Sequence, residues 1–488
     1  MAASLTSDFA ASLDGLAVCV AGLGVSGPPA ARMLAGHGAR VTAVDARDDA
    51  GRRALAAELA AAGVRVLLGE DAVRTPPAGT ALVVTSPGWP PTVPLLAAAA
   101  RAGIDVLGDV ELAWRLRPVL PDGSRQHWLA VTGTNGKTTT VRMLAAMLIA
   151  AGYRAVAAGN VGTSAVEVAR AAEPYYVVAV ELSSFQLHWS STIAPDAAVI
   201  LNLAAHHLDW HGDVRAYAAA KAKIYAPGTL AVCNADDAGS SALAAAASGI
   251  RRVVPFRLGE PGPGELGVSG GYLVDRAFGD RDVRLAAVAD IASADPALAA
   301  RPAAPHIVAD ALAAAALARA YGTPPPAVAA ALRAFRPDPH RISLVGTVGG
   351  VDFVDDSKAS NPHAAMASLT AFGSVVWVAG GQFKGADEDL DALVVAAAPR
   401  LRGVVLLGAD RERVARALAR HAPQVPVVEA AGTDTGVMDI VVAKAAGLAE
   451  PGDTVLLAPA AQSFDMFRDY PARGEAFAAA VARLAASR

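Results

Sequence analysis

The chain has 488 residues, and about 150 residues per domain predicts roughly three domains. Hydrophobic residues make up 53% and charged residues 18%, which excludes an intrinsically disordered chain. With 42 basic and 46 acidic residues the formal charge is −4, so no bulk basic field exists to hold nucleic acid or anionic lipid. Two cysteines make no disulfide framework, and we find neither a signal peptide nor a spanning apolar run. We expect a cytoplasmic protein with no nucleic-acid or membrane partner.

Three segments each open with a strand-like apolar run and then alternate strands with helical patterns. This alternation predicts an α/β protein of three domains, each built on a doubly wound, mostly parallel sheet. Pro- and Gly-containing stretches separate the segments, so we place the domains at residues 1–118, 126–336 and 339–488. A Gly/Pro-rich stretch at 258–282 inside the second domain predicts a surface loop or a hairpin.

The first segment contains a glycine turn after its first strand. Gly22, Gly24 and Gly27 match G-x-G-x-x-G, and Asp45 ends the next strand. Glycines at a helix start bind a diphosphate, and an acid at the next strand end accepts ribose hydroxyls. NAD and UDP both satisfy this pattern, so the turn alone leaves the two open.

The second segment opens with the strongest local signal, a phosphate-binding loop at 131–140. Gly133 and Gly136 allow backbone N–H groups to converge on phosphate oxygens at a helix start. Lys137 would reach the β- and γ-phosphates and Thr138 would hold Mg²⁺. The full phosphate-loop pattern has glycine at 131, where this chain has Val131. The loop nevertheless predicts a bound nucleoside triphosphate.

Candidate metal ligands follow in the same segment. Glu181 ends an apolar strand, where a carboxylate suits Mg²⁺, although it could equally cap a helix. Histidines gather just past another strand in the stretch 206–211. Lys221 and Lys223 lie in a helical stretch, where a solvated face is the default interpretation.

A series of motifs runs through all three segments. They are GLGVSG (22–27), SPG (86–88), GTNGKTTT (133–140), GNVG (159–162), ELSSFQL (181–187), HHLDWH (206–211), YAAAKAKIY (217–225), NADD (234–237), HR (340–341), DDSKASN (355–361), GGQFKGAD (380–387) and APAAQSFDMFRDYPARG (458–474). In this order the motifs resemble the Mur ligase family, and the last three are similar to its D-glutamate-adding branch.

The resemblance implies an ATP-dependent, ADP-forming amide ligase of peptidoglycan synthesis that works through an acyl phosphate. It implies a Rossmann-like first domain, a P-loop ATPase-like central domain and a Rossmann-like third domain. The implied substrates are UDP-N-acetylmuramoyl-L-alanine, ATP and D-glutamate, with two Mg²⁺ ions and a CO₂-derived carbamate on Lys221. We expect a monomer.

The resemblance also implies the site residues. The implied catalytic residues are Lys137, Glu181, His207 and Lys221. The implied metal ligands are Thr138, Glu181, His207 and carbamylated Lys221. The implied ATP site comprises Gly133, Thr134, Asn135, Gly136, Lys137, Thr138, Thr139 and Arg341. The implied uridine-substrate site comprises Val25, Ser26, Asp45, Arg47, Ser86, Gly88 and Asn160. The implied D-glutamate site comprises Lys358, Ser360, Lys384, Ser463 and Tyr470.

Several positions depart from the family pattern. His206 stands where the family usually has an acid, Ser360 where it has Thr, and Tyr470 where it has Phe. The adenine-side helix usually begins H-N-x-x-N, whereas this chain has Ile307 and Asp310 at the two amide positions. The resemblance therefore assigns no residue that recognises adenine.

Three functions stay open at this point. The first is the D-glutamate ligase, and the second is a Mur-type ligase that adds a different amino acid. The third is a nucleotide-binding module, either a dehydrogenase built on the 22–27 turn or an ATP-binding switch, which leaves the motifs at 355–361 and 458–474 unexplained. Folylpolyglutamate synthase, a related enzyme, lacks the N-terminal domain.

Overall fold

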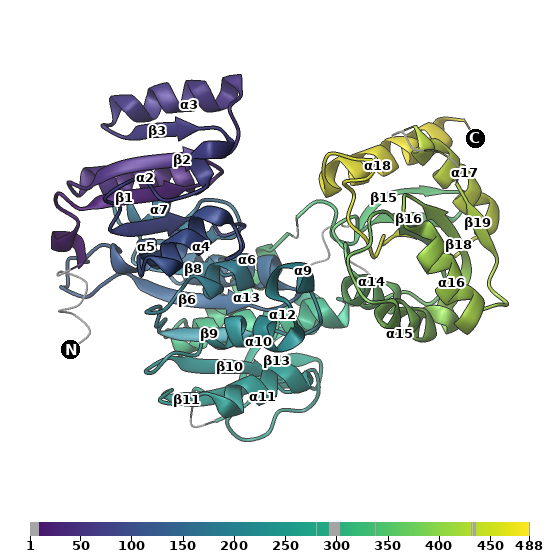
Figure 1. Cartoon of the computed structure of the whole chain (residues 1–488). Coiled ribbons are helices and arrows are strands. Elements are labelled where there is room, and N and C mark those ends of the chain that lie inside the picture. The colour runs from purple at the N-terminus through teal and green to yellow at the C-terminus, as the bar shows by residue number, and fades with distance from the viewer. Residues whose placement is uncertain are drawn as a thin grey trace.

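The protein is described by a computed structural model that covers residues 9–279, 281–291, 303–336, 338–430, 432 and 436–487. Within these residues the strands form three sheets of five, nine and six strands, one after another along the chain (Figure 1). The three-domain α/β architecture predicted from the sequence is therefore confirmed. The sheets span residues 17–108, 127–287 and 343–457, and the exact domain boundaries stay a prediction.

The N-terminal sheet is parallel and has the strand order β3-β2-β1-β4-β5. Its strands are short runs rich in Val and Ala, as expected for strands covered on both faces. They are β1 (Ala17–Ala21), β2 (Arg40–Asp45), β3 (Arg65–Leu68), β4 (Leu82–Thr85) and β5 (Asp105–Gly108). The helices are α2 (Gly27–Gly36), α3 (Ala50–Ala61), η1 (Glu70–Val73), α4 (Pro94–Arg101) and α5 (Asp109–Arg115).

The central sheet has the order β14-β13-β12-β11-β10-β9-β6-β8-β7. Its parallel part is β6 (His127–Thr132), β7 (Ala155–Gly159), β8 (Val177–Glu181), β9 (Ala197–Ile200), β10 (Leu230–Asn234) and β11 (Arg252–Phe256). The Gly/Pro-rich stretch adds β12 (Leu266–Ser269), parallel to β11, and then β13 (Tyr272–Asp275) and β14 (Val283–Ala287), which pair antiparallel. Of the two predictions for 258–282, the hairpin is the one that forms.

The helices of the central domain surround its sheet. They are α6 (Lys137–Ala150), α7 (Ala165–Ala169), α8 (Ser184–His188), α9 (Leu208–His211), α10 (Val214–Ala222), α11 (Ala238–Ala246), η2 (Val288–Asp290), α12 (Pro305–Ala320) and α13 (Pro325–Ala334). The Ala-rich α12 packs against α6, the helix that follows the phosphate loop. Because ten residues of α12 are buried, nine of them small or apolar and one an acid, Asp310, this helix lies inside the domain.

The C-terminal sheet has the order β15-β16-β20-β17-β18-β19, with β15 antiparallel to β16. Its strands are β15 (Ser343–Val348), β16 (Val351–Asp355), β17 (Val375–Gly380), β18 (Leu401–Leu407), β19 (Val427–Glu429) and β20 (Thr454–Leu457). Its helices are α14 (Pro362–Leu369), α15 (Asp387–Ala397), η3 (Ala398–Arg400), α16 (Arg411–His421), α17 (Val437–Leu448) and α18 (Tyr470–Ala486).

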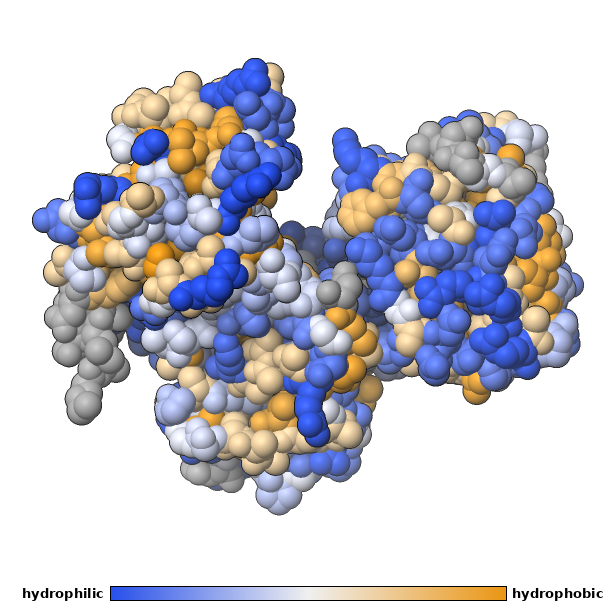
Figure 2. All heavy atoms as spheres, viewed as in Figure 1, coloured by the Kyte–Doolittle hydropathy of each residue, from blue (hydrophilic) through white to orange (hydrophobic). Residues whose placement is uncertain are grey.

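The hydrophobic cores divide the molecule unequally. One core cluster contains buried residues of both the N-terminal and the central domain, for example Val110 and Trp114 beside Val166 and Leu187. The two clusters of the C-terminal domain contain only residues from 342 onward. On the face of the molecule drawn in Figure 2, a hollow lies between the N-terminal and C-terminal domains. The first two domains thus share apolar packing, whereas the third folds around its own cores.

No helix in the described part of the chain is both long and apolar enough to cross a membrane.

The glycine turn of the N-terminal domain supplies a test of close packing. A Cβ at Gly27 would lie 1.9 Å from the Gly22 carbonyl oxygen, whereas a Cβ at Gly24 meets nothing within 4 Å. We expect Gly27→Ala to lower the free energy of unfolding by about 1–3 kcal/mol through overpacking, measured by urea denaturation. Gly24→Ala is the matched control, with an expected change below about 0.5 kcal/mol. Equal effects of the two substitutions would contradict this packing.

Candidate active site

In the central and N-terminal sheets, the strand order brings predicted site residues together at the carboxyl ends of neighbouring strands. In the central sheet β6 lies between β8 and β9, so the phosphate loop after β6 is flanked by Glu181 and by Asn202. In the N-terminal sheet β1 lies next to β4, so the 22–27 turn adjoins the 86–88 turn. Open parallel sheets bind ligands at such carboxyl ends, where neighbouring connections diverge.

Two glycines and one amide shape the phosphate loop. Gly136 has φ of 84°, and a Cβ there would lie 2.2 Å from Asp310 Oδ1, so only glycine fits this turn. Asn202 Oδ1 accepts hydrogen bonds from the backbone N–H groups of Thr134 (3.1 Å) and Asn135 (2.8 Å). These hydrogen bonds therefore fix the backbone of the loop just before helix α6 begins.

A cavity of about 650 Å³ lies in front of this loop. Its lining joins the central domain to the segment after β16 of the C-terminal domain. The predicted residues that line it are Thr134, Asn135, Gly136, Lys137, Thr138, Thr139, Asn160, Glu181, Arg341, Lys358 and Ser360. The structure thus brings most of the implied ATP site together with Asn160 and with two residues of the implied D-glutamate site.

Two buried lysines share one carbonyl beneath the loop. Lys137 Nζ donates to the carbonyl oxygens of Gly133 (3.0 Å) and Thr134 (2.9 Å). Lys221 Nζ also donates to the Gly133 carbonyl oxygen, at 2.8 Å. Burial lowers the pKa of Lys137, and burial together with the Lys137 charge lowers the pKa of Lys221 well below its usual value. In the described structure, both ammonium groups donate to carbonyl or hydroxyl oxygens of the loop and of Thr132.

Two further cations reach the cavity from the C-terminal side. Arg341 and Lys358 both line it, and the Lys358 ammonium lies 4.0 Å from the centre of the Tyr470 ring. Burial and the charge of Arg341 lower the pKa of Lys358 to about 8. Three cations, Lys137, Arg341 and Lys358, thus line the cavity beside the acids Glu181, Asp237, Asp310 and Asp356, so the lining offers charged partners both to phosphate groups and to a metal ion.

Oxygen ligands for a metal lie at the same place. Thr138 Oγ1 donates to Glu181 Oε2 at 2.9 Å, and Asn160 Nδ2 donates to Glu181 Oε1 at 2.9 Å. Glu181 is only 2% exposed. In the part of the chain that the structure describes, no group of three or more His, Cys, Asp and Glu side chains could hold a metal ion. A cation here would thus need the Thr138 hydroxyl and ligands from elsewhere.

The two adjacent histidines have different surroundings. His206 lines the cavity, and burial and the neighbouring His207 lower its pKa to about 3, so His206 is neutral near pH 7. His207 packs against Phe185, with ring centres 4.7 Å apart. The backbone of His207 is left-handed, with φ of 56°, an unfavourable conformation for a residue other than glycine.

A second cavity of about 370 Å³ lies over the glycine turn of the N-terminal domain. Asp45, Arg47 and Ser86 line it, as the resemblance implies, together with Trp89. Asp45 Oδ2 accepts a hydrogen bond from the backbone N–H of Leu23 at 2.8 Å and so also fixes the turn.

The other predicted residues of the uridine site lie around the same turn. Val25 is 83% exposed, whereas Ser26 is buried. A Cβ at Gly88 would meet nothing within 4 Å, so this glycine borders open space. The structure brings Asp45, Arg47 and Ser86 into one cavity and leaves Val25 open to a ligand.

The implied D-glutamate residues come from three strand ends of the C-terminal domain. Gln382 and Gln462 pair through their backbones, which brings the loop bearing Lys384 beside the segment bearing Ser463. Lys384 is exposed, whereas Ser463 is buried.

The buried Arg473 organises this part of the domain. Its guanidinium donates to the carbonyl oxygens of Ser357 (2.9 Å) and Ala461 (3.1 Å). The Ser357 hydroxyl donates to the Tyr470 carbonyl oxygen at 2.8 Å. Arg473 thus fixes the segments that carry Lys358 and Ser463.

Sequence reasoning missed several residues of the site. Asn361 Nδ2 donates to Asn135 Oδ1 at 3.0 Å, which is a direct contact between the C-terminal domain and the phosphate loop. Asn202 holds the loop, and His306 and Asp310 line the cavity from α12. Asn361 belongs to the motif DDSKASN, so the sequence did mark it as a candidate. The role of Asn202 can be predicted only when the strand order is known.

Fold and site together define a nucleotide-binding α/β protein whose phosphate loop faces a separate C-terminal domain. Three family descriptions match the chain: "Mur ligase MurD-like, N-terminal domain" at 17–108, "Mur ligase middle domain" at 131–261 and "Mur ligase, glutamate ligase domain" at 340–461. A curated relative from Thermobifida fusca, named UDP-N-acetylmuramoylalanine–D-glutamate ligase, is 58% identical over 480 residues, which is 97% of this chain and 99% of the relative. The chain belongs to the Mur ligase family.

Solved structures share the fold at much lower identity. The pseudomurein peptide ligase type C from Methanothermus fervidus has a TM-score of 0.59 at 16% identity, covering 96% of this chain and 100% of that chain. A bifunctional folylpolyglutamate synthase/dihydrofolate synthase with Mn, AMPPNP and L-glutamate bound has a TM-score of 0.53 at 18% identity, covering 81% of this chain and 98% of that chain. The first of these structures matches nearly the whole chain and the second a smaller share of it, so both show a shared fold.

The carboxyl of Asp310 generates a pH-dependent prediction. Burial raises its pKa to about 8, although Arg341 opposes the shift. Because the pKa is near 3.9 in an unfolded chain, the folded state holds one more proton between about pH 4 and pH 8. The unfolding free energy of the wild type should therefore fall with rising pH, by up to about 1.4 kcal/mol per pH unit, relative to Asp310→Asn.

Urea denaturation of both proteins from pH 5 to pH 8 measures this difference. Asp71→Asn, at a carboxylate that is 93% exposed, is the control and should change stability by less than about 0.5 kcal/mol. A constant difference between wild type and Asp310→Asn across the range would contradict the buried, protonated state.

Proposed function

We propose that the chain is an ATP-dependent, ADP-forming amide ligase that joins D-glutamate to UDP-N-acetylmuramoyl-L-alanine in cytoplasmic peptidoglycan precursor synthesis. The observation that carries this proposal is the 58% identity to a relative of that name over nearly the full length of both chains. The three cations Lys137, Arg341 and Lys358 in the cavity between the phosphate loop and the 355–361 segment support it, because ATP and two carboxylate substrates are all anionic.

The first step forms an acyl phosphate. A carboxylate oxygen of the alanyl group attacks the γ-phosphorus of ATP, and the bond from that phosphorus to the β,γ-bridging oxygen breaks, which releases ADP. Both reactants are anions, so catalysis consists mainly of positioning and charge neutralisation. Lys137, Arg341 and Lys358, which line the cavity, supply positive charge where negative charge gathers.

The second step forms the amide. The D-glutamate amine, once neutral, attacks the acyl carbonyl carbon. The tetrahedral intermediate expels inorganic phosphate as the amide carbonyl reforms, and the nitrogen gives up one proton, which phosphate can take. Lys358, Ser360, Lys384, Ser463 and Tyr470 bind D-glutamate in this proposal. Two lysines and three hydroxyl groups suit a dicarboxylate, whose ends accept charge-assisted hydrogen bonds. The uridine nucleotide is held by Val25, Ser26, Asp45, Arg47, Ser86 and Gly88, with Asn160 reaching the alanyl portion.

The reaction needs a divalent cation, and the residues present fit Mg²⁺. The Thr138 hydroxyl and the Glu181 carboxylate lie 2.9 Å apart beside the phosphate loop and offer the oxygen atoms that this hard cation prefers. We place Thr138, Glu181, His207 and carbamylated Lys221 as the ligands of two ions. Mg²⁺ supplies neutralisation of phosphate charge when bound.

A carbamate would change the sign of the charge at Lys221. The ammonium lies beneath the phosphate loop, 1% exposed, with the like charge of Lys137 close by. Addition of CO₂ to the amine replaces this positive charge with a carboxylate-like oxygen pair. Both the repulsion from Lys137 and the repulsion of a cation at Glu181 are then relieved.

The proposed activity is tested by mixing enzyme, ATP, Mg²⁺ and UDP-N-acetylmuramoyl-L-alanine with single amino acids and measuring phosphate release and amide product. We expect product with D-glutamate and none with L-alanine or L-lysine. Product with L-lysine but not D-glutamate would favour a Mur-type ligase for a different amino acid. Tight NAD(H) binding with no amide product would favour the nucleotide-binding module.

The two lysines of the stretch 217–225 test the carbamate. Lys221→Ala should lower kcat at least about 100-fold, because it removes charge control at the reacting phosphate. Lys223→Ala, whose ammonium donates to the His188 and Ser190 carbonyl oxygens outside the cavity, should lower kcat less than about 10-fold.

A readout independent of turnover is carbon-13 NMR in labelled bicarbonate. A carbamate signal should be present in the wild type and in Lys223→Ala and absent in Lys221→Ala. The same signal in all three proteins, or in none, would remove the carbamate from the proposal.

A further inference from the structure

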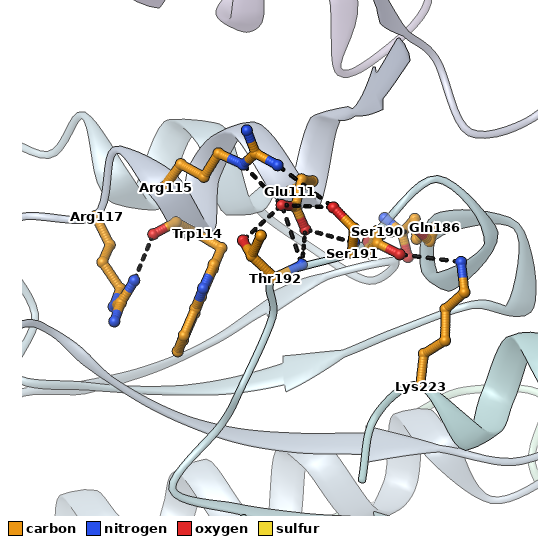
Figure 3. A network of polar contacts seen from close by, with 9 residues as sticks. All are labelled: Glu111, Trp114, Arg115, Arg117, Gln186, Ser190, Ser191, Thr192 and Lys223. Atoms are coloured by element: carbon orange, nitrogen blue, oxygen red, sulfur yellow. Dashed lines mark hydrogen bonds and ion pairs between the residues drawn. The ribbon is translucent and has the colours of Figure 1, made fainter. Parts of the chain in front are cut away.

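The first turn of helix α5 brings two buried acids against the central domain. This helix follows β5, the last strand of the N-terminal sheet, and Asp109 and Glu111 are 4% and 0% exposed. Neither residue lines the cavities described above, and neither has a role in the proposed chemistry. Figure 3 shows Glu111 pointing from α5 toward the segment 190–192 of the central domain.

Glu111 is saturated with hydrogen bonds from that segment. The Thr192 hydroxyl donates to Oε1 at 2.6 Å, and the backbone N–H groups of Ser191 and Thr192 donate to Oε2 at 3.0 and 3.1 Å. Arg115, one turn along the same helix, pairs with Oε1 at 2.7 Å. These donors outweigh burial and lower the pKa of Glu111, so the carboxylate is charged.

We call residues 181–192 the α8 region, because helix α8 lies within it. Glu111 holds the end of this region, and Glu181 lies at its start. Helix α8 (Ser184–His188) begins three residues after Glu181, with Ser183 as its N-cap. Beyond its C-terminus, Lys223 donates to the Ser190 carbonyl oxygen at 3.0 Å (Figure 3). Since Lys223 lies two residues after Lys221, the α8 region connects Glu111 with both Glu181 and the Lys221 helix.

The same region contacts the wall of the uridine cavity. Trp189 Nε1 donates to the carbonyl oxygen of Trp89, which lines that cavity, at 3.3 Å. The Gly108 N–H donates to the Trp189 carbonyl oxygen at 3.0 Å, and a Cβ at Gly108 would lie 3.0 Å from Trp189 Cβ. The wall of the uridine cavity and the α8 region are thus in direct contact at Trp89 and Gly108.

Asp109 adds a link to the glycine turn. The Ser26 hydroxyl and the Gln186 side chain both interact with its carboxyl group. Ser26 belongs to the implied uridine site, and Gln186 lies in the first turn of α8. Asp109 and Glu111 therefore contact opposite ends of the α8 region.

We propose that Glu111 is a positioning residue, which holds the α8 region so that the uridine cavity and the phosphate loop keep a fixed separation. A substrate anchored by its nucleotide then presents its carboxylate at the phosphate loop without a further search. Such positioning lowers the barrier of a reaction between two bound groups without strengthening the binding of either. The inference rests on the proposed ligase function and adds a determinant of its rate outside both cavities.

The test compares Glu111→Ala, Glu111→Gln and the control Arg117→Ala. Arg117 lies just past the other end of α5. Its guanidinium donates to the Trp114 carbonyl oxygen at 2.7 Å and lies over the Trp114 ring, so both contacts stay within its own segment (Figure 3). The measurements are kcat for amide formation, and the dissociation constants of UDP and of ADP by calorimetry. The proposed UDP site and the phosphate loop lie in the two domains that the Glu111 contact joins, and neither includes Glu111, so these constants report the local integrity of each cavity.

For Glu111→Ala we expect kcat to fall at least about 10-fold while both dissociation constants stay within about two-fold of wild type. Glu111→Gln keeps one acceptor oxygen for Thr192, so it should recover part of the loss, and Arg117→Ala should match the wild type. If Glu111→Ala does not fold, the glutamine variant is judged alone by the same split between kcat and binding.

Two outcomes would overturn the inference: kcat within about two-fold of wild type in both Glu111 variants, or loss of UDP and ADP binding in parallel with kcat. The second outcome would mean that Glu111 only supports folding. Wild-type enzyme that makes no amide product would instead refute the proposed function, so the two failures are distinguishable.

Discussion

Mutual repulsion among buried cations is the constraint on which the site depends. Lys137, Lys221, Arg341 and Lys358 lie in or beneath one cavity, and burial together with the like charge of a neighbour lowers the pKa of each of the three lysines. Lys137 and Lys221 donate to the Gly133 carbonyl oxygen, and the nearby Glu181 carboxylate raises the pKa of all three lysines against the effect of burial. Phosphate groups that enter the cavity can meet Lys137, Arg341 and Lys358, which all line it.

The hydrophobic cores stabilise the interface between the N-terminal and central domains but not the interface between the central and C-terminal domains. A shared core and the Glu111 hydrogen bonds join the N-terminal and central domains, so the uridine cavity and the phosphate loop belong to one rigid unit. The C-terminal domain contacts the phosphate loop through the side chains of Asn135 and Asn361, two neutral amides. Closure of this second interface can therefore deliver Arg341 and the amino-acid site to the nucleotide while the first interface stays unchanged.

The sequence predicted the long apolar strands and the motifs at their ends, because each depends on a local pattern of alternating residue types. It gave no signal for the short strands at or near the sheet edges, such as Arg65–Leu68 and Val427–Glu429, whose side chains are only partly buried. The roles of Asn202 and Asn361 depend on strand order and on contact between domains, which no local pattern contains. Lys223, expected on a solvated face, is exposed and also donates to two carbonyl oxygens, whereas Lys221, for which a solvated face was the default interpretation, is buried.

The cores of the C-terminal domain contain no residue of the other two domains. The side chains that would select the incoming amino acid therefore sit in a unit with its own hydrophobic cores. Substitutions at Lys384 and Ser463, which do not line the cavity at the phosphate loop, can retune amino-acid preference with little effect on nucleotide binding. Such modularity offers a physical route by which one scaffold can diversify into enzymes for successive additions to a growing peptide.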